Sequence, residues 1–308
     1  MLKTKRRTLI PLLLCAFVLF AASLACEGEG IGSSADDISL QQTEISLGLT
    51  QTAIASVQLN PPQDQPATEA PQVTEEIIAE VVPDVSYEGV SFSFDSSIAA
   101  SVSPSTVPGQ NPGEDYMPGD TYPTHYEFFF NGYALADTFY TPIILVYPVA
   151  EYESISQSAV DSFAEFRTAL NTHPSAGADK HLPFLPFWNA AQILTAQSAY
   201  FDFQNGSGLR YLAMYGQDLY PVDNKNLFYT YQGMTNDGAY YVSATMPISN
   251  PVLPNDGDDV VGDWNTFMNN WDTYLVETIQ LLGEQTPQSY YPQMNLLDAM
   301  MQSLSINP

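Results

Sequence analysis

The stretch SAYFDFQNGSGLRYLAMY, residues 198–215, decides the fold of this chain. Apolar and aromatic residues that favour strands fill both halves, and the run at 205–208 between them is rich in turn-forming residues, so the stretch predicts an antiparallel hairpin. A second stretch of the same design, LFYTYQGMTNDGAYYVSATM at 227–246, has a loop that ends in Asn-Asp-Gly at 236–238. Two hairpins in succession predict an antiparallel sheet.

The chain N-terminal to these hairpins adds strands to the predicted sheet. Alternating or continuous apolar runs predict strands at 90–94, 126–130 and 142–147. The segment 103–122, which is rich in Pro and Gly, is expected to be a loop. The sheet therefore extends over most of the region that begins at Val85.

Helices are predicted on both sides of the hairpins along the chain. Apolar positions three and four residues apart indicate helices at 156–170 and 264–282, the second after an acidic loop at 251–263. Residues 296–304 are expected to form a short last helix or the entry to a strand. These elements predict an α+β domain over 85–308, in which helices pack on an antiparallel β-sheet as an α/β sandwich.

The first 25 residues have the features of a secretory signal peptide. Four basic residues precede an apolar run at 9–20 that is too short to span a bilayer comfortably, and small residues follow it. The run Ser-Leu-Ala-Cys at 23–26 resembles the lipobox of bacterial lipoproteins, although Ser23 and Leu24 stand in swapped order. The resemblance implies that Cys26 is the lipid attachment site and that the protein is anchored at the outer face of the cell membrane.

The alternative is ordinary cleavage after Ala25, or an uncleaved anchor, with Cys26 uninvolved. The count of cysteines favours lipidation, because Cys15 lies in the apolar run and an unmodified product would keep one lone thiol in an oxidising space. Acylation of Cys26 also excludes an intramolecular disulfide in the mature chain. The domain then depends on its hydrophobic core for stability.

Residues 26–84 are expected to form a stalk and a linker. Leu40, Leu47 and Ile54 recur every seven residues, which favours at most two heptads of helix, and Gly48 weakens that helix. A disordered tether is the favoured alternative for this part. The mixture of Pro, Gln, Thr and Glu at 63–83 cannot build a core and predicts an extended spacer.

The charge of the chain restricts its partners. Four of the eight basic residues lie in the signal, which leaves Arg167, Lys180, Arg210 and Lys225 against 35 acidic residues. Nucleic acid is excluded as a partner, because binding to phosphates requires clustered cations. Anionic lipid headgroups would repel the same surface, so contact with the membrane is expected through the lipid anchor.

Known catalytic patterns are missing from the sequence. The run Gly206-Ser207-Gly208 lacks the spacing of a nucleophile elbow and belongs to a predicted turn. The histidines His125, His173 and His181 are not spaced with one another or with carboxylates as a zinc site requires. We therefore expect no catalytic residues, no metal site and no cofactor.

Two acidic clusters offer oxygen ligands of the kind that calcium prefers. One is the run 255–259 with Asp263 beyond it, and the other comprises Glu114, Asp115 and Asp120. Neither matches an EF-hand, and a solvated turn of like charges is the favoured interpretation. Arg210, in a predicted hairpin strand, is expected to form a structural ion pair, with an acidic ligand as the alternative.

Aromatic residues are the remaining lead to a ligand. The chain contains 19 tyrosines and 3 tryptophans, at 188, 264 and 271. Such rings stack on sugars or peptides in proteins outside the cytoplasm, but they also pack the cores of β-rich domains, which is the favoured interpretation here.

Several stretches carry a resemblance to other proteins. Those at 182–186, 189–192, 200–208 and 238–243 resemble uncharacterised bacterial surface lipoproteins, a resemblance that implies no particular activity. More distantly, the strands at 90–94 and 238–246 and the run Met-Met-Gln-Ser-Leu at 300–304 are similar to the PsbP-like fold of photosystem accessory proteins. That resemblance implies an assembly or accessory role.

The function expected from the sequence is therefore that of a noncatalytic, lipid-anchored binding or accessory domain, whose partner is an unidentified protein or small molecule. An extracytoplasmic hydrolase with catalytic residues dispersed over several loops is the alternative. A mainly structural envelope component is a third interpretation. The largest cavity of the domain distinguishes them: a histidine and a carboxylate together there would favour the hydrolase.

Overall fold

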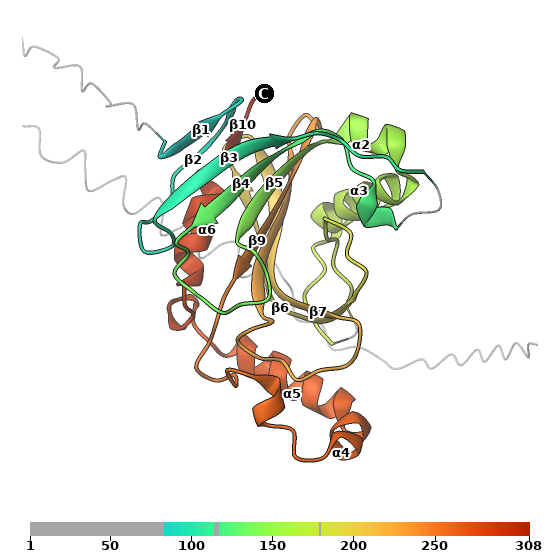
Figure 1. Ribbon diagram of the computed structural model, residues 1–308, viewed down its shortest axis with the longest axis vertical. Helices are drawn as coiled ribbons and strands as arrows, with labels where there is room; N and C mark the ends of the chain where they lie inside the picture. The colour runs from blue at the N-terminus through green and yellow to red at the C-terminus, as the bar shows by residue number, and fades with distance from the viewer. Residues whose placement is uncertain (1–82, 114–116, 179) are drawn as a thin grey trace, which may run out of the picture. The chain divides into compact units, whose positions relative to one another are not determined.

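The computed structural model describes residues 83–113, 117–178 and 180–308 (Figure 1). The predicted signal peptide, Cys26, the stalk and nearly all of the linker lie outside the described residues. Glu114 and Asp115 of the second acidic cluster also lie outside them.

A seven-stranded antiparallel sheet forms the centre of the domain, as predicted (Figure 1). Its order in space is β3-β4-β5-β9-β8-β7-β6. The strands are β3 (Ser101–Val107), β4 (His125–Asn131), β5 (Ile143–Pro148), β6 (Ala191–Phe203), β7 (Gly206–Gly216), β8 (Phe228–Thr235) and β9 (Tyr240–Pro247). Both predicted hairpins, β6–β7 and β8–β9, are present, and β9 pairs with β5 to join them to the N-terminal strands.

A small second sheet brings the two ends of the described domain together. It consists of β1 (Val85–Tyr87), β2 (Val90–Phe92) and β10 (Ser305–Ile306), with β2 in the middle. The side chain of Asn205, at the tip of the β6–β7 hairpin, donates to the carbonyl of Ile306 at 2.7 Å and accepts from its N–H at 3.1 Å. The end of the chain is thereby tied to the central hairpin.

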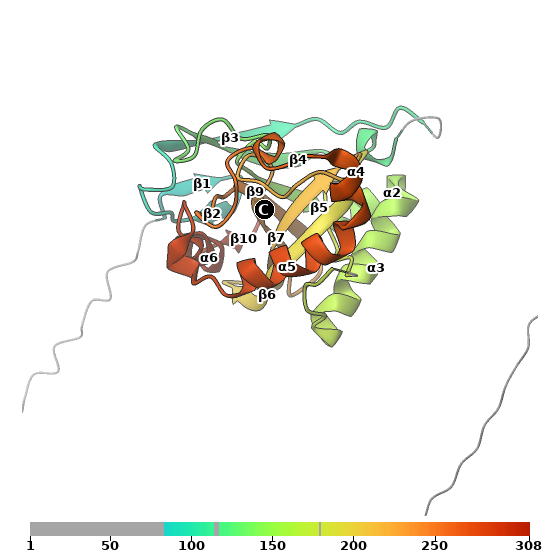
Figure 2. The ribbon, with the colours of Figure 1, turned by 90° about the horizontal axis from the view of Figure 1, so that it is seen from below.

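Helices cover both faces of the large sheet, which confirms the predicted sandwich. They are α2 (Val149–Ile155), α3 (Gln157–Thr172), α4 (Trp264–Asn269), α5 (Trp271–Gly283) and α6 (Met294–Gln302). The helices α2 and α3 pack with one set of alternating strand residues, including Tyr211 and Tyr241. The opposite set, including Leu212 and Val242, packs with α5, α6 and the small sheet (Figures 1 and 2). Successive side chains of β7 and β9 point to opposite faces of the sheet, so each strand contributes to the core on both faces.

The helix predicted at 264–282 and the loop predicted at 103–122 have different boundaries in the structure. The helix expected over 264–282 is interrupted at Asn270, whose ψ of 10° is not helical and whose side chain donates to the Thr266 carbonyl at 2.8 Å. Asparagine competes in this way for backbone groups. The loop expected over 103–122 begins as β3, an exposed strand at the edge of the sheet, where serine and Pro104 are tolerated because one side of the strand needs no partner.

The glycines at 206 and 208 have a role that the sequence did not show. The turn itself consists of Gln204 and Asn205, because Phe203 already pairs with Gly206. Both glycines lie within β7, and a Cβ on Gly208 would lie 2.4 Å from Cζ of Tyr231. Gly208 leaves space for the Tyr231 ring, whose hydroxyl donates to the Phe201 carbonyl at 2.9 Å, and Gly206 leaves space for the Phe203 ring.

Candidate functional site

A large cavity in the described part of the chain lies at one end of the large sheet. Its volume is about 900 Å³. The end of β7, the beginning of β5 and Thr245 of β9 form its floor, and loop residues from 139–141, 186–190 and 217–226 form its walls. A cavity of this size, partly apolar and open on one side, is typical of a site for a small ligand.

Aromatic rings form one wall of the cavity. Tyr140 and Trp188 are stacked, with ring centroids 5.1 Å apart and an angle of 14° between the rings. Tyr215 meets the Trp188 ring edge-on at 5.2 Å, and Phe184 meets it at 4.7 Å from outside the cavity. Trp188 is only half-buried, so part of its indole is available to a ligand.

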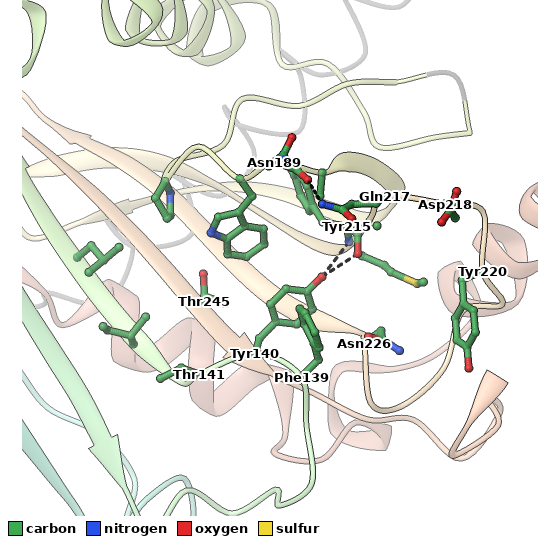
Figure 3. Close-up of a pocket in the computed structure, with 17 residues that line it drawn as sticks. Phe139, Tyr140, Thr141, Asn189, Tyr215, Gln217, Asp218, Tyr220, Asn226 and Thr245 are labelled. Carbon is green, nitrogen blue, oxygen red and sulfur yellow. Dashed lines mark hydrogen bonds between the residues drawn. The ribbon is translucent and has the colours of Figure 1, made fainter. Parts of the chain in front are cut away.

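The Tyr140 ring is held in place by the backbone of β7. The ladder between β7 and β8 ends at the pair Ala213 and Phe228, so Tyr215 lies beyond the last partner strand. The Tyr140 hydroxyl takes the place of that strand, because it donates to the Tyr215 carbonyl at 3.0 Å and accepts from its N–H at 3.1 Å (Figure 3). Burial raises the pKa of Tyr140 to about 12, so this phenol remains a donor at neutral pH.

Polar side chains surround the aromatic wall. Figure 3 shows Thr245 to one side of Tyr140, and Asn226 and Asp218 to the other. The Nδ2 atom of Asn226 donates to Asp223 at 2.8 Å, which leaves its Oδ1 atom as an acceptor. The Thr245 hydroxyl and the Asp218 carboxylate line the cavity as well. Because the Trp188 indole N–H and the Asn189 amide also belong to the lining, the cavity offers both donors and acceptors to a ligand.

The charge of the cavity is slightly negative. Asp218 is the one ionisable acid among the residues that line it, and none of these residues is Lys, Arg or His. Lys225 lies on the adjacent loop, but its ammonium group forms an ion pair with Asp256. An anionic ligand would find no free cation here.

The comparisons with known proteins were negative. No protein family, curated protein or solved structure matches this chain. The resemblances to surface lipoproteins and to the PsbP-like fold therefore remain predictions.

The three histidines do not meet. His125 is buried in β4, with Nδ1 2.9 Å from the Pro123 carbonyl and Nε2 3.4 Å from Glu127. His173 ends α3 with a φ of 48°, and its ring packs on Tyr200. His181 is exposed, and none of the three lines the large cavity.

Arg210 forms the structural ion pair that we expected. Its Nε and Nη2 atoms donate to the two oxygens of Asp298 on α6, at 3.2 and 3.3 Å. Its Nη1 atom donates to the Gln197 carbonyl, and the Tyr229 hydroxyl donates to Asp298 at 3.0 Å. Burial raises the pKa of Asp298, although Arg210 and Tyr229 oppose that effect.

Two carboxylates of the acidic loop, those of Asp256 and Asp263, bind groups of the protein itself. Asp256 accepts from Lys225 and, at 3.1 Å, from the Tyr220 hydroxyl. Asp263 accepts from the N–H and hydroxyl of Thr266 at the start of α4. In the second cluster, Asp120 accepts from the Met117 N–H at 3.2 Å. Within the described ranges, no group of three or more His, Cys, Asp or Glu side chains could hold a metal ion.

None of the helices in the described part of the chain is both long and apolar enough to cross a membrane.

The aromatic wall is the part of the site that sequence reasoning missed. Trp271 is a core residue, as the favoured interpretation predicted, whereas Trp188 lines the cavity and Trp264 is 43% exposed. A signal was present, because Trp188 follows Pro183 and Pro186 and precedes Asn189, an arrangement typical of a loop. An aromatic residue in such a loop is less often part of a core than one in a strand.

Proposed function

We propose that the domain at 85–308 is a noncatalytic binding domain, held at the outer face of a membrane by a lipid on Cys26. Its cavity takes up an uncharged ligand with a flat apolar face. The observation that carries this proposal is the stacked pair of Tyr140 and Trp188, with uncharged polar groups and one carboxylate, but no cation, among the other lining residues. Rings of this kind bind one face of a ligand, and polar groups at the rim set its orientation.

The composition of the cavity favours binding over hydrolysis. Acid–base catalysis by carboxylates uses two such groups on either side of the reacting bond, whereas one carboxylate, Asp218, lines this cavity. The Tyr140 hydroxyl is occupied by the backbone of Tyr215. The hydrolase alternative, which needs a histidine or a second carboxylate here, has no comparable support within the described residues.

The ligand class can be tested by saturation-transfer NMR on the full-length protein in detergent. The probes are methyl glucoside, methyl galactoside and N-acetylglucosamine as neutral compounds, and glucuronate as an anionic one. We expect a neutral probe to bind and glucuronate to bind less, because of Asp218. Trp188→Ala should abolish the signal, since it removes the stacking surface.

A second and smaller substitution, Thr245→Val, keeps the test valid if Trp188→Ala does not fold. Thr245→Val keeps the volume and removes the hydroxyl, so affinity should fall about 5-fold, the value of one hydrogen bond. Val276→Ala, on the exposed side of α5, is the control and should bind as the wild type does. Binding that is unchanged in Trp188→Ala and Thr245→Val, or no binding of any probe, contradicts the proposal.

The anchor can be tested separately by fractionation of cells that express the protein. Cys26→Ser removes the acceptor of the lipid thioether, so we expect the protein to move from the membrane fraction to the soluble extracytoplasmic fraction. Ser34→Ala, close by in the same region, is the matched control and should stay with the membrane. An unmodified Cys26 thiol in the mass spectrum of the wild-type protein would refute the lipid anchor.

A further inference from the structure

A second cavity adjoins the first. Its volume is about 540 Å³, and it is lined by Trp264 and Met268 of α4 and by residues at the beginning of β6. Gly216, Gln217, Asp218 and Tyr220 line both cavities. The two cavities are thus neighbours on either side of one short segment, 216–220.

Trp264 gives the second cavity an aromatic surface of its own. Its ring packs against Tyr220 at 6.0 Å and meets Phe267 edge-on at 5.6 Å. The cap at Asp263 fixes the start of α4, and Tyr220 is held through its hydrogen bond to Asp256. Trp264 is therefore held in position although 43% of its surface is exposed, an unusual state for so large an apolar residue.

We propose that the two cavities form one groove that binds a linear chain of neutral sugar units. One ring of the chain stacks on Trp188 and another on Trp264, and the part between them crosses the segment 216–220. This inference rests on the proposed function and specifies its ligand. A chain with repeating rings matches two separate aromatic surfaces, whereas a single small ligand would use only the first cavity.

The hydrogen-bonding groups favour sugar over an apolar chain. The polar groups of the first cavity include acceptors, namely the Asn226 Oδ1 atom and the Asp218 carboxylate, and groups that can donate, such as the Thr245 hydroxyl and the Asn189 amide. Sugar hydroxyls supply donors around the edge of a ring whose face is apolar, so one unit satisfies both the acceptors and the aromatic wall. An acyl chain would leave these acceptors without partners.

The backbone at the edge of β7 disfavours a peptide ligand. Extended peptides gain affinity by pairing with a free strand edge. At the mouth of this cavity, the edge of β7 at Tyr215 already has its N–H and carbonyl bound by the Tyr140 hydroxyl. Sugars need no such edge.

Calorimetry with the full-length protein in detergent tests the proposal. The probes are two neutral series, β-1,4-linked glucose and β-1,4-linked N-acetylglucosamine, from the monosaccharide to the hexasaccharide. We expect affinity in one series to rise with length and then to level off. The gain from contact with Trp264 should be about 3- to 10-fold, the range for one aromatic contact.

Variants of Trp264 and Trp188 test the two aromatic surfaces separately. Trp264→Ala should reduce the affinity of long oligomers to that of short ones and leave the monosaccharide unaffected, because the residue is exposed and lies outside the first cavity. Trp264→Phe should restore part of the gain. Trp188→Ala should weaken oligomers of every length, and Val276→Ala should change none.

Each outcome decides between the two proposals. If a monosaccharide binds through Trp188 but length or Trp264 has no effect, the groove is wrong and the binding cavity stands. A neutral amide without a sugar ring, N-acetylglycinamide, is titrated as a further probe. If it binds there and no sugar does, the sugar assignment is wrong and the binding cavity stands. If nothing binds, both proposals fail.

Discussion

Replacing Arg210 with alanine is expected to lower the free energy of unfolding by about 3 to 5 kcal/mol, the usual cost of leaving one member of a buried ion pair alone. Arg210 is 7% exposed, and Asp298 accepts hydrogen bonds from both Arg210 and Tyr229. Without the guanidinium, the carboxylate would remain between β7 and α6 with a single phenol as donor. Urea denaturation followed by circular dichroism measures the loss.

Two further variants show whether the pair itself is responsible. Arg167→Ala breaks an exposed ion pair with Glu153 and should cost less than about 1 kcal/mol. The double variant Arg210→Met with Asp298→Leu should regain most of the stability, because apolar residues can replace a buried pair. A loss in Arg210→Ala no larger than that in Arg167→Ala would refute the prediction.

The loss of unfolding free energy in Arg210→Ala should also depend on pH. Burial already raises the pKa of Asp298 in the folded protein, and the loss of Arg210 raises it further. A folded-state pKa above the unfolded value means that the folded chain holds the proton more tightly, so this residue destabilises the fold as the pH rises through that value. The difference in the free energy of unfolding between Arg210→Ala and the wild type should therefore become smaller as the pH falls from 7 toward 4.

The second large effect is expected in alkali, where the whole domain should unfold cooperatively between about pH 10.5 and 11.5. Burial raises the pKa of many tyrosines above the model-compound value of 10.0. They include Tyr140, Tyr147, Tyr152, Tyr211, Tyr229, Tyr231, Tyr241 and Tyr290.

The sign of this effect follows from proton binding. Above pH 10 the unfolded chain releases its phenolic protons while the folded chain retains them, so the free energy of unfolding falls as the pH rises. Each such tyrosine contributes up to about 1.4 kcal/mol per pH unit until it ionises in the folded state, near pH 12 for Tyr140 and Tyr290. Several together exceed the stability of an ordinary domain, about 5 to 15 kcal/mol, within roughly one pH unit.

The measurement is a pH titration that follows tyrosinate absorbance and far-ultraviolet circular dichroism together. The two signals should change at the same pH and over a narrow range. In concentrated urea, the same absorbance should instead rise gradually around pH 10. Full ionisation near pH 10 with intact secondary structure would show that these phenols are accessible in the folded protein.

The candidate site shows where reasoning from the sequence reaches its limit. The β6–β7 and β8–β9 hairpins follow from local patterns, yet the cavity beside them is assembled from distant residues. Tyr140 reaches Tyr215 across 75 positions, and Thr245 comes from a third segment. The histidines and acidic runs attracted attention because they are rare or clustered in the sequence, but folding distributes them over separate surfaces.

Local chemistry was sufficient for much of the architecture. Alternation and turn residues predicted the two hairpins, because strand period and turn formation depend on neighbours along the chain. A partner for Arg210 was also foreseen from the scarcity of cations. Its identity as Asp298, the pairing of β5 with β9, and the aromatic wall around Tyr140 depended on contacts between residues far apart in sequence. Such contacts form only when the loops between them close and the helices settle on the sheet, so no pattern of neighbouring residues encodes them separately.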